Sequence, residues 1–178
     1  YKGGSWAAAK RQLLRSTAHL VLLQETKLKG EAIDEASSWA LANGWKILFE
    51  EAGQGVIGKP SAGCAIAIRA RFGMSQPPGR DSCTVAQHRL MGPLVEFPGV
   101  SFVAYSGYWK ASEGMSERNF ELTAALGEHT QAHGKSFVAG GDFNVGPETV
   151  QAAGLIEHMG ATIVHSCPSL GTFVHSGG

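Results

Sequence analysis

The chain has 178 residues, of which 43% are hydrophobic and 17% are charged, and its 15 basic and 15 acidic residues give a net charge of zero. This composition is that of an ordinary globular protein, so it argues against a disordered chain and predicts a single domain over residues 1–178. The balanced charge argues against a basic coat protein for nucleic acid, but a nuclease can obtain positive charge from a bound cation.

Three cysteines, Cys64, Cys83 and Cys167, are spread along the chain without a C-x-x-C pair. An odd and widely spaced set of cysteines disfavours both a disulfide framework and a zinc site. No apolar stretch approaches the roughly 18 residues of a membrane span, and the N-terminus lacks a signal-peptide layout. We therefore expect an intracellular protein, with the nucleus as one option, and no membrane partner.

Helical and extended signals alternate along the first part of the chain. We expect a helix from Trp6 that Ser5 caps, a buried strand over residues 19–24, a helix over residues 31–43 that Gly44 ends, and a strand over residues 45–49. Strand signals then follow in succession over residues 62–70, 89–97 and 100–109, separated by turns rich in Gly and Pro.

The last third of the chain carries a long helical signal and further strand signals. We expect a helix from Ser116 to about His133, a strand into Asp142, a short helix that Pro147 begins, and late strands over residues 161–165 and 172–175. Because the middle strands look antiparallel, the pattern predicts an α/β fold: a two-sheet β-sandwich flanked by helices, and not a doubly wound parallel sheet.

The segment SFVAGGDFNVGPETV, residues 136–150, ends a buried strand on two glycines. Asp142 and Asn144 are two positions apart, so in an extended segment both side chains point to the same side, with Phe143 turned the other way. Gly140 and Gly141 allow close approach to the backbone, and we interpret the approaching group as a phosphate backbone.

The segment LVLLQETKL places Glu25 at the end of another apolar strand. Taken alone, Glu25 is most simply a solvated residue where a strand leaves the sheet. Paired with Asp142, which also follows an apolar strand, it suggests that two carboxylates converge on one hard divalent cation through oxygen ligands.

In this order, LLQETK, SAGCAIAIR, a strand ending in tyrosine, and GGDFNVGP resemble the endonuclease/exonuclease/phosphatase superfamily. That superfamily includes pancreatic deoxyribonuclease, exonuclease III-type abasic-site endonucleases, inositol polyphosphate 5-phosphatases and the endonuclease domains of non-LTR retrotransposons. The resemblance covers nearly all of the chain, and residues 88–126 look like the retroelement-type members. It implies the four-layer architecture of deoxyribonuclease I for the predicted sandwich.

The resemblance also implies roles for four residues. Glu25 matches the glutamate that ligates Mg²⁺, with Mn²⁺ as the alternative ion, and Asp142 matches the aspartate that orients or deprotonates the attacking water. Asn144 matches the asparagine that hydrogen-bonds the scissile phosphate. The phosphate-contacting tyrosine is either Tyr105 or Tyr108; we prefer Tyr108 because it stands last before the loop, whereas Tyr105 lies deeper in the strand.

Other residues near these motifs have simpler interpretations. His129 and His133 share a helix face, but the segment between them lacks the glutamate of a zinc protease, so we predict an exposed pair. His88 and Arg89 are predicted to be surface residues. Trp109 has two interpretations, as a core residue or as a residue that stacks on a base.

The resemblance implies a magnesium-dependent phosphodiester hydrolase, and we prefer a DNA endonuclease of the retroelement or abasic-site type. DNA is then the substrate, and a reverse transcriptase downstream in the parent chain is an optional partner. A phosphomonoesterase acting on inositol phosphates and a catalytically inactive binding relative remain as alternatives.

By the same resemblance, a first strand with a metal-binding asparagine and a last strand with a catalytic histidine are expected outside residues 1–178. The chain is therefore expected to be an inactive fragment. His165 and His175 are not expected to replace the missing histidine, because neither stands at its position in the family pattern.

Overall fold

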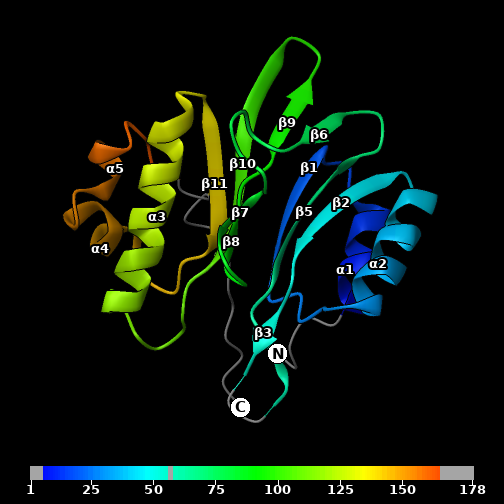
Figure 1. Ribbon diagram of the computed structural model, residues 1–178, viewed down its shortest axis with the longest axis horizontal. Helices are drawn as coiled ribbons and strands as arrows, with labels where there is room; N and C mark the ends of the chain where they lie inside the picture. The colour runs from blue at the N-terminus through cyan, green and yellow to red at the C-terminus, as the bar shows by residue number, and fades with distance from the viewer. Residues whose placement is uncertain (1–5, 56–57, 165–178) are drawn as a thin grey trace.

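The computed structural model describes residues 6–55 and 58–164 and arranges them as two main sheets with helices on both outer sides (Figure 1), together with a small two-stranded sheet. The helices are α1 (Trp6–Arg15), α2 (Glu31–Ala42), α3 (Glu117–His133), α4 (Pro147–Ala152) and α5 (Leu155–His158). The strands are β1 (Leu20–Gln24), β2 (Trp45–Glu50), β3 (Gly53–Gln54), β4 (Pro60–Ser61), β5 (Cys64–Arg69), β6 (Gly73–Ser75), β7 (Thr84–Ala86), β8 (Leu90–Met91), β9 (Leu94–Phe97), β10 (Val100–Tyr108) and β11 (Phe137–Asp142). The predicted α/β sandwich with flanking helices is confirmed.

The first sheet has the order β1-β5-β2, and both pairings are antiparallel. Its central strand, β5, reads CAIAIR, and all but its last residue are buried. A strand covered on both faces needs apolar side chains on both, which explains this continuous run. On one face lie α1 and α2 (Figure 1), and on the other lies the second sheet, so β5 forms the centre of the sandwich.

The second sheet has the order β6-β9-β10-β8-β7, with β11 added parallel to β10. The single strand predicted over residues 89–97 is wrong, because Gly92 and Pro93 divide it into β8 and β9. A side chain at Gly92 would meet the ring of Tyr105, and Pro93 has no N–H to donate to a ladder. Both short strands nevertheless pair with β10, at different points along its length.

Helix α3 covers the outer face of the second sheet together with α4 and α5 (Figure 1). Ser116 caps α3 because its side chain accepts a hydrogen bond from the N–H of Asn119. The helix ends at Gly134, whose φ of 56° lies in the left-handed region that favours glycine. Both ends of α3 therefore agree with the sequence prediction.

The predicted strand over residues 161–165 is wrong for 161–164, which have no regular structure. A strand requires a hydrogen-bonded neighbour, and Val164 is 90% exposed. Ser5, Cys167, His165 and the strand predicted over residues 172–175 lie outside the described residues. In the described ranges, no helix has the length and apolar character needed to cross a membrane.

Candidate active site

Three strands end close together at one end of the sandwich. Strand β10 ends at Tyr108 and β11 ends at Asp142, and these two residues are partners in the parallel register. Strand β1 ends one residue before Glu25. The carboxyl ends of three strands thus bring together side chains that are more than a hundred positions apart in sequence, as Glu25 and Asp142 are.

A direct hydrogen bond joins two of the predicted residues: the Tyr108 hydroxyl donates to Glu25 Oε1 at 2.8 Å. Lys27 Nζ lies 3.7 Å from the same oxygen, and the Glu25 side chain is 38% exposed. Burial raises the pKa of Tyr108 to about 12, and the carboxylates of Glu25 and Asp142 add to the shift while Arg89 opposes it. At neutral pH Tyr108 is therefore a protonated phenol that acts as a hydrogen-bond donor.

The backbone is strained at two of the four predicted residues. Glu25 has a φ of 52° and Asn144 a φ of 51°, in the left-handed region. Asparagine adopts this conformation more readily than glutamate does, so the strain is greater at Glu25. Next to Glu25, hydrogen bonds from Thr26 N to Gly63 O and from Lys27 N to Ala62 O, both 3.1 Å long, hold the turn in place.

Asp142 and Asn144 are tied to the residue that follows Tyr108. Trp109 N donates to Asp142 O at 2.9 Å, and Asn144 Nδ2 donates to Trp109 O at 2.8 Å. The carboxylate of Asp142 is exposed, and its Oδ1 accepts from Asn144 N at 3.3 Å. Glu25 and Asp142 are thus connected through Tyr108 and its neighbour.

Trp109 is 1% exposed and belongs to the core. Its ring stacks on Phe143 at a centroid distance of 4.3 Å, and its Nε1 donates to Thr123 Oγ1 at 2.9 Å. The base-stacking interpretation is wrong, because a buried ring that is already stacked has no face for a base.

Arg89 lies beside Tyr108, although the sequence predicted only a surface residue. Its Nη1 donates to Tyr108 O at 3.2 Å, and its guanidinium carbon is 5.5 Å from the centroid of the Tyr108 ring. The pairing of Leu90 with Gly107 in the sheet brings the two residues together. The sequence carried no signal for this contact, because it depends on strand register.

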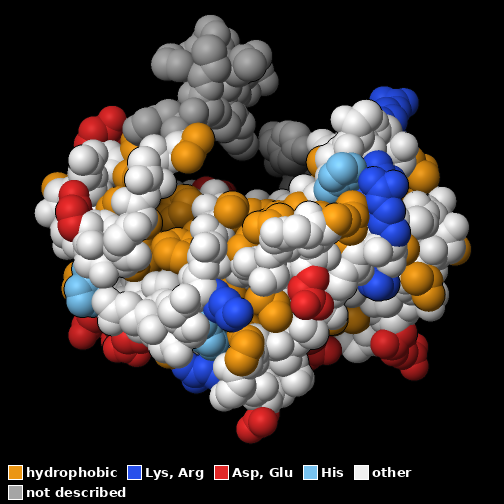
Figure 2. All heavy atoms as spheres, turned by 90° about the horizontal axis from the view of Figure 1, so that it is seen from above, with side chains coloured by type: hydrophobic (Ala, Val, Ile, Leu, Met, Phe, Trp, Pro, Cys, Tyr) orange, Lys and Arg blue, Asp and Glu red, His pale blue; other side chains and the backbone are white. Residues whose placement is uncertain are grey.

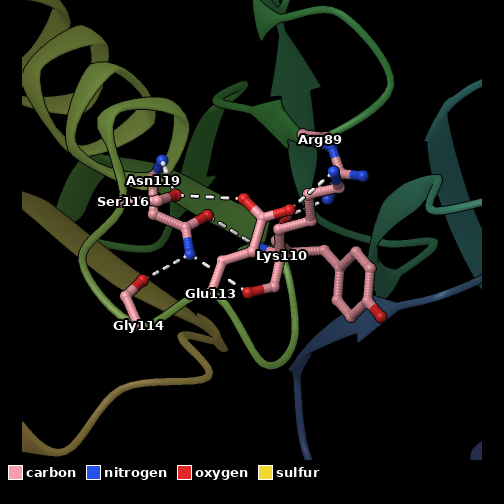
Figure 3. Close-up of polar contacts among 7 residues, drawn as sticks. Arg89, Lys110, Glu113, Gly114, Ser116 and Asn119 are labelled. Carbon is pink, nitrogen blue, oxygen red and sulfur yellow. Dashed lines mark hydrogen bonds and ion pairs between the residues drawn. The ribbon is translucent and has the colours of Figure 1, made fainter.

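A buried amide from α3 fixes the loop after Tyr108 (Figure 3). Asn119 is 1% exposed; its Oδ1 accepts from Lys110 N at 2.8 Å, and its Nδ2 donates to Lys110 O at 3.0 Å and to Gly114 O at 2.6 Å. Within the loop, Lys110 and Glu113 form an ion pair of 2.7 Å, and Ser116 Oγ donates to Glu113 at 3.0 Å. Hydrogen bonds from α3 and within the loop therefore fix the loop beside the candidate site.

The two glycines before Asp142 serve the packing of the protein itself. A side chain at Gly140 would come within 2.6 Å of Leu22 Cδ1 in β1, and one at Gly141 would meet the carbonyl oxygen of Gly107 in β10. The interpretation that a phosphate backbone fills this space is wrong, because neighbouring strands already occupy it.

The predicted exposed histidine pair on α3 is wrong for His129, which is 5% exposed. Its Nδ1 lies 2.8 Å from the Tyr105 hydroxyl and 3.1 Å from His133 Nε2. Tyr105 is 1% exposed, in agreement with the core position expected for it. This cluster lies between β10 and α3 and is separate from Tyr108.

The side chains at the strand ends suit an oxygen-ligated metal ion. Glu25 and Asp142 are hard oxygen donors, and Mg²⁺ commonly binds one or two carboxylates and completes its shell with water and phosphate. Over residues 6–55 and 58–164, no group of three or more His, Cys, Asp or Glu residues could hold a metal. Two carboxylates are a donor set that fits an ion whose remaining ligands are water and phosphate.

Comparisons with known proteins bear on the family and the fold of the chain. A model of the Endonuclease/Exonuclease/phosphatase family matches residues 3–174. The comparison with curated proteins found no match.

Several solved structures share the fold. The endonuclease domain of TRAS1, a telomere-specific non-LTR retrotransposon, is 15% identical with a TM-score of 0.54 and coverage of 85% of this chain and 63% of that one. The human Nocturnin catalytic domain with bound sulfate is 18% identical, with a TM-score of 0.59 and coverage of 82% and 59%. The AP endonuclease LMAP from Leishmania major is 13% identical, with a TM-score of 0.58 and coverage of 86% and 62%. These identities establish likeness of fold alone, and the chain spans less than two thirds of each of these structures.

Proposed function

Because the chain belongs to the Endonuclease/Exonuclease/phosphatase family, we propose that it is a magnesium-dependent phosphodiester hydrolase and that it cleaves DNA as an endonuclease. The retroelement or abasic-site type is supported by the shared fold of the TRAS1 endonuclease domain and the Leishmania major AP endonuclease. A reverse transcriptase elsewhere in the parent protein is part of the proposal only for the retroelement type.

The observation that carries the proposal is the hydrogen bond of 2.8 Å from Tyr108 to Glu25, next to the strand end that carries Asp142. This contact joins the carboxylate that is proposed to bind the metal to a phenol that stays protonated at neutral pH. Backbone strain at Glu25 and Asn144 supports the same location, because strained residues concentrate at functional sites.

Each residue has a proposed task. Glu25 holds Mg²⁺ or Mn²⁺, and the bound ion supplies Lewis-acid stabilisation of charge on the phosphate. Tyr108 fixes the orientation of the Glu25 carboxylate through its hydroxyl. Asp142, whose carboxylate is exposed, accepts the proton of the attacking water. Asn144 gives one amide hydrogen to Trp109 O and offers the other to a non-bridging phosphate oxygen.

The test compares two substitutions in the full-length protein that carries this chain, with nicking of supercoiled DNA as the assay. Asp142→Asn removes the proton acceptor and is expected to lower the rate by roughly 10² to 10⁴ at every Mg²⁺ concentration. Glu25→Gln keeps the shape but removes the charge, so raised Mg²⁺ is expected to restore part of its activity. Glu121→Gln, an exposed carboxylate on α3, is the matched control.

Wild-type rates for Asp142→Asn would refute the proposed water activation. Abasic DNA and an inositol phosphate, each with magnesium and with EDTA, distinguish the endonuclease from the phosphomonoesterase that the family description also allows. Binding without turnover of any of these substrates would favour an inactive relative.

A further inference from the structure

A hollow of about 710 Å³ lies at the end of the sandwich opposite Tyr108, and His19, Arg71, Phe72, Glu96 and Phe97 contribute to its lining. Strand β10 begins at Val100, close to the hollow, and ends at Tyr108. At about 3.3 Å per residue, its length separates the two sites by on the order of 25 Å. The hollow is therefore distinct from the candidate active site.

Aromatic rings form a continuous row beside this hollow. The ring of His19 packs on Phe72 at a centroid distance of 5.2 Å, Phe72 on Phe97 at 4.5 Å, and Phe97 on Phe102 at 5.8 Å. Phe72 is buried, whereas Phe97 is only partly buried. Phe97 stacks on Phe102 and packs against Phe72, so these rings hold it rigid while part of its surface stays accessible.

Basic groups stand next to these rings. Arg71 is exposed, its guanidinium carbon lies 4.8 Å from the centroid of Phe72, and its Nη2 lies 3.2 Å from His19 Nε2. Lys46 Nζ donates to the carbonyl oxygen of Phe72 at 2.9 Å, which places another positive charge at the same turn. Arginine presents five donors in a planar fork, so the contact with His19 leaves most of the Arg71 donors for a ligand.

The cations of this region have no carboxylate partner in the part of the chain that the structure describes. The two ion pairs found there, Lys27 with Glu25 and Lys110 with Glu113, both lie toward the opposite end. Figure 2 looks onto the end that carries the hollow and shows basic side chains and a histidine gathered over its α1 and α2 side, next to hydrophobic side chains. Glu96 is the one carboxylate in the lining of the hollow.

We propose that this hollow binds one nucleotide of a single-stranded nucleic acid, with the base stacked on Phe97 and the phosphate held by Arg71 and His19. An accessible aromatic ring beside unpaired cations is the combination that single-strand binding requires, because every base has a π-face and every linkage carries a negative charge. The volume lies within the usual range of roughly 300–1,000 Å³ for small-molecule sites. The proposal goes beyond the hydrolytic function and does not require turnover.

A single strand fits this site better than a duplex or an acidic peptide does. In a duplex the bases are stacked on each other, so their faces are not free to meet Phe97. An acidic peptide would satisfy Arg71 but would gain nothing from a flat ring. The two contacts together therefore select a ligand that carries both a phosphate and an unstacked base.

The test measures binding of fluorescein-labelled decathymidylate to the chain by polarisation, in EDTA so that no cleavage occurs. Arg71→Gln and Phe97→Leu are each expected to weaken binding about tenfold, since stacking of one base is worth about that factor or more. Phe97→Leu keeps an apolar side chain at this position, and circular dichroism is used to check that the variant folds. Phe97→Tyr, which keeps the ring, is expected to bind within about twofold of wild type.

Two controls separate this site from general electrostatic attraction and from the candidate active site. Lys135→Gln removes one exposed positive charge outside the hollow and is expected to leave affinity unchanged within about twofold. Tyr108→Phe reports on binding at the candidate active site and is compared with Arg71→Gln.

Equal losses from Lys135→Gln and Arg71→Gln would overturn the proposal, because they would show nonspecific attraction. Loss of binding in Tyr108→Phe with none in Arg71→Gln would also overturn it, because the strand would then bind at the candidate active site. Tighter binding of a duplex of the same length that depends equally on Arg71 would also overturn the proposal. It would show that the site contacts the phosphate backbone and does not stack on a base.

Discussion

The two sides of the sandwich have different interiors. The cluster between the first sheet and helices α1 and α2 is apolar, and its buried members are Leu13, Ala40, Trp45, Ile47, Ala65 and Ala67. The interior between the second sheet and α3 also contains buried polar groups, namely Asn119, Thr123, His129 and Thr130. Apolar contacts are non-directional and fix the distance between layers, whereas hydrogen bonds also fix the direction of each side chain.

This difference parallels what each side contributes to the candidate site. The first sheet supplies Glu25 alone, at a strained turn. The second side supplies Tyr108, Asp142 and Asn144. Hydrogen bonds from α3 hold Trp109 and Lys110, the two residues that follow Tyr108. We infer that the apolar side mainly provides stability and that the polar side mainly provides orientation, and three substitutions test this division.

The largest expected effect comes from breaking the apolar side. Trp45 is 0% exposed, and Arg69 lies over its ring at 4.1 Å. Trp45→Ala is expected to lower the free energy of unfolding by about 3–5 kcal/mol through lost burial and the cavity left behind. Urea denaturation followed by circular dichroism measures it.

Trp45→Phe is the matched control. The buried Trp45 Nε1 has no hydrogen-bond partner among the described residues, so removing this N–H breaks no hydrogen bond there. We expect a smaller loss than for Trp45→Ala, because phenylalanine keeps much of the apolar volume and leaves a smaller cavity. An equal loss in the two variants would contradict the view that apolar volume stabilises this side.

An intermediate effect is expected from Asn119→Ala on the polar side. The substitution leaves the N–H and carbonyl of Lys110 and the carbonyl of Gly114 without their buried partner, which is expected to cost about 1–3 kcal/mol. Hydrogen exchange at Lys110 is expected to accelerate more than the loss of global stability predicts. Glu121→Ala, on the exposed face of α3, is the control, and unchanged exchange at Lys110 would show that the loop does not depend on Asn119.

The smallest effect at neutral pH is expected from His129→Gln, whose main effect is expected in acid. Burial, with His133 and Arg80 nearby, lowers the pKa of His129 from 6.5 to about 4. Between these pH values the unfolded chain binds a proton at His129 and the folded chain does not. The stability that neutral His129 contributes is therefore fully present above about pH 6.5 and is lost as the pH falls toward 4. Thermal melts between these values are expected to show a shallower acid decline in His129→Gln.

The exposed His158, changed to Gln, serves as the control for this measurement because its environment differs from that of His129. Wild type and His158→Gln are expected to share the same acid decline. The same decline in His129→Gln would place the acid-sensitive group elsewhere in the protein.

The fold could be predicted wherever a long stretch keeps one pattern. The apolar runs of β1 and β5 and the capped helix α3 are of this kind. The strands β3, β4, β6 and β7 were missed because two or three residues are too short to show a period. Gly92 and Pro93 interrupt an apolar run that otherwise reads as one strand.

The candidate site could be predicted only in part. Glu25, Asp142, Asn144 and Tyr108 stand in local motifs, and their roles stay predictions. Arg89 depends on the pairing of β8 with β10, which no local pattern encodes. Asn119 and His129 look like ordinary polar residues on a helix, and only the packing of α3 on the sheet shows that they are buried. The glycines before Asp142 were noticed, but which group approaches them depends on how β1 and β10 pack.

The left-handed backbone at Glu25 bears on any attempt to evolve this protein toward heat resistance. With a φ of 52°, the residue carries a conformational cost of about 1–3 kcal/mol that glycine would not carry. A library selected for melting temperature alone is therefore expected to be enriched in Glu25→Gly, which discards the carboxylate proposed to bind the metal. Selection for thermal tolerance must hold this codon fixed, or it will return stable proteins without the proposed metal ligand.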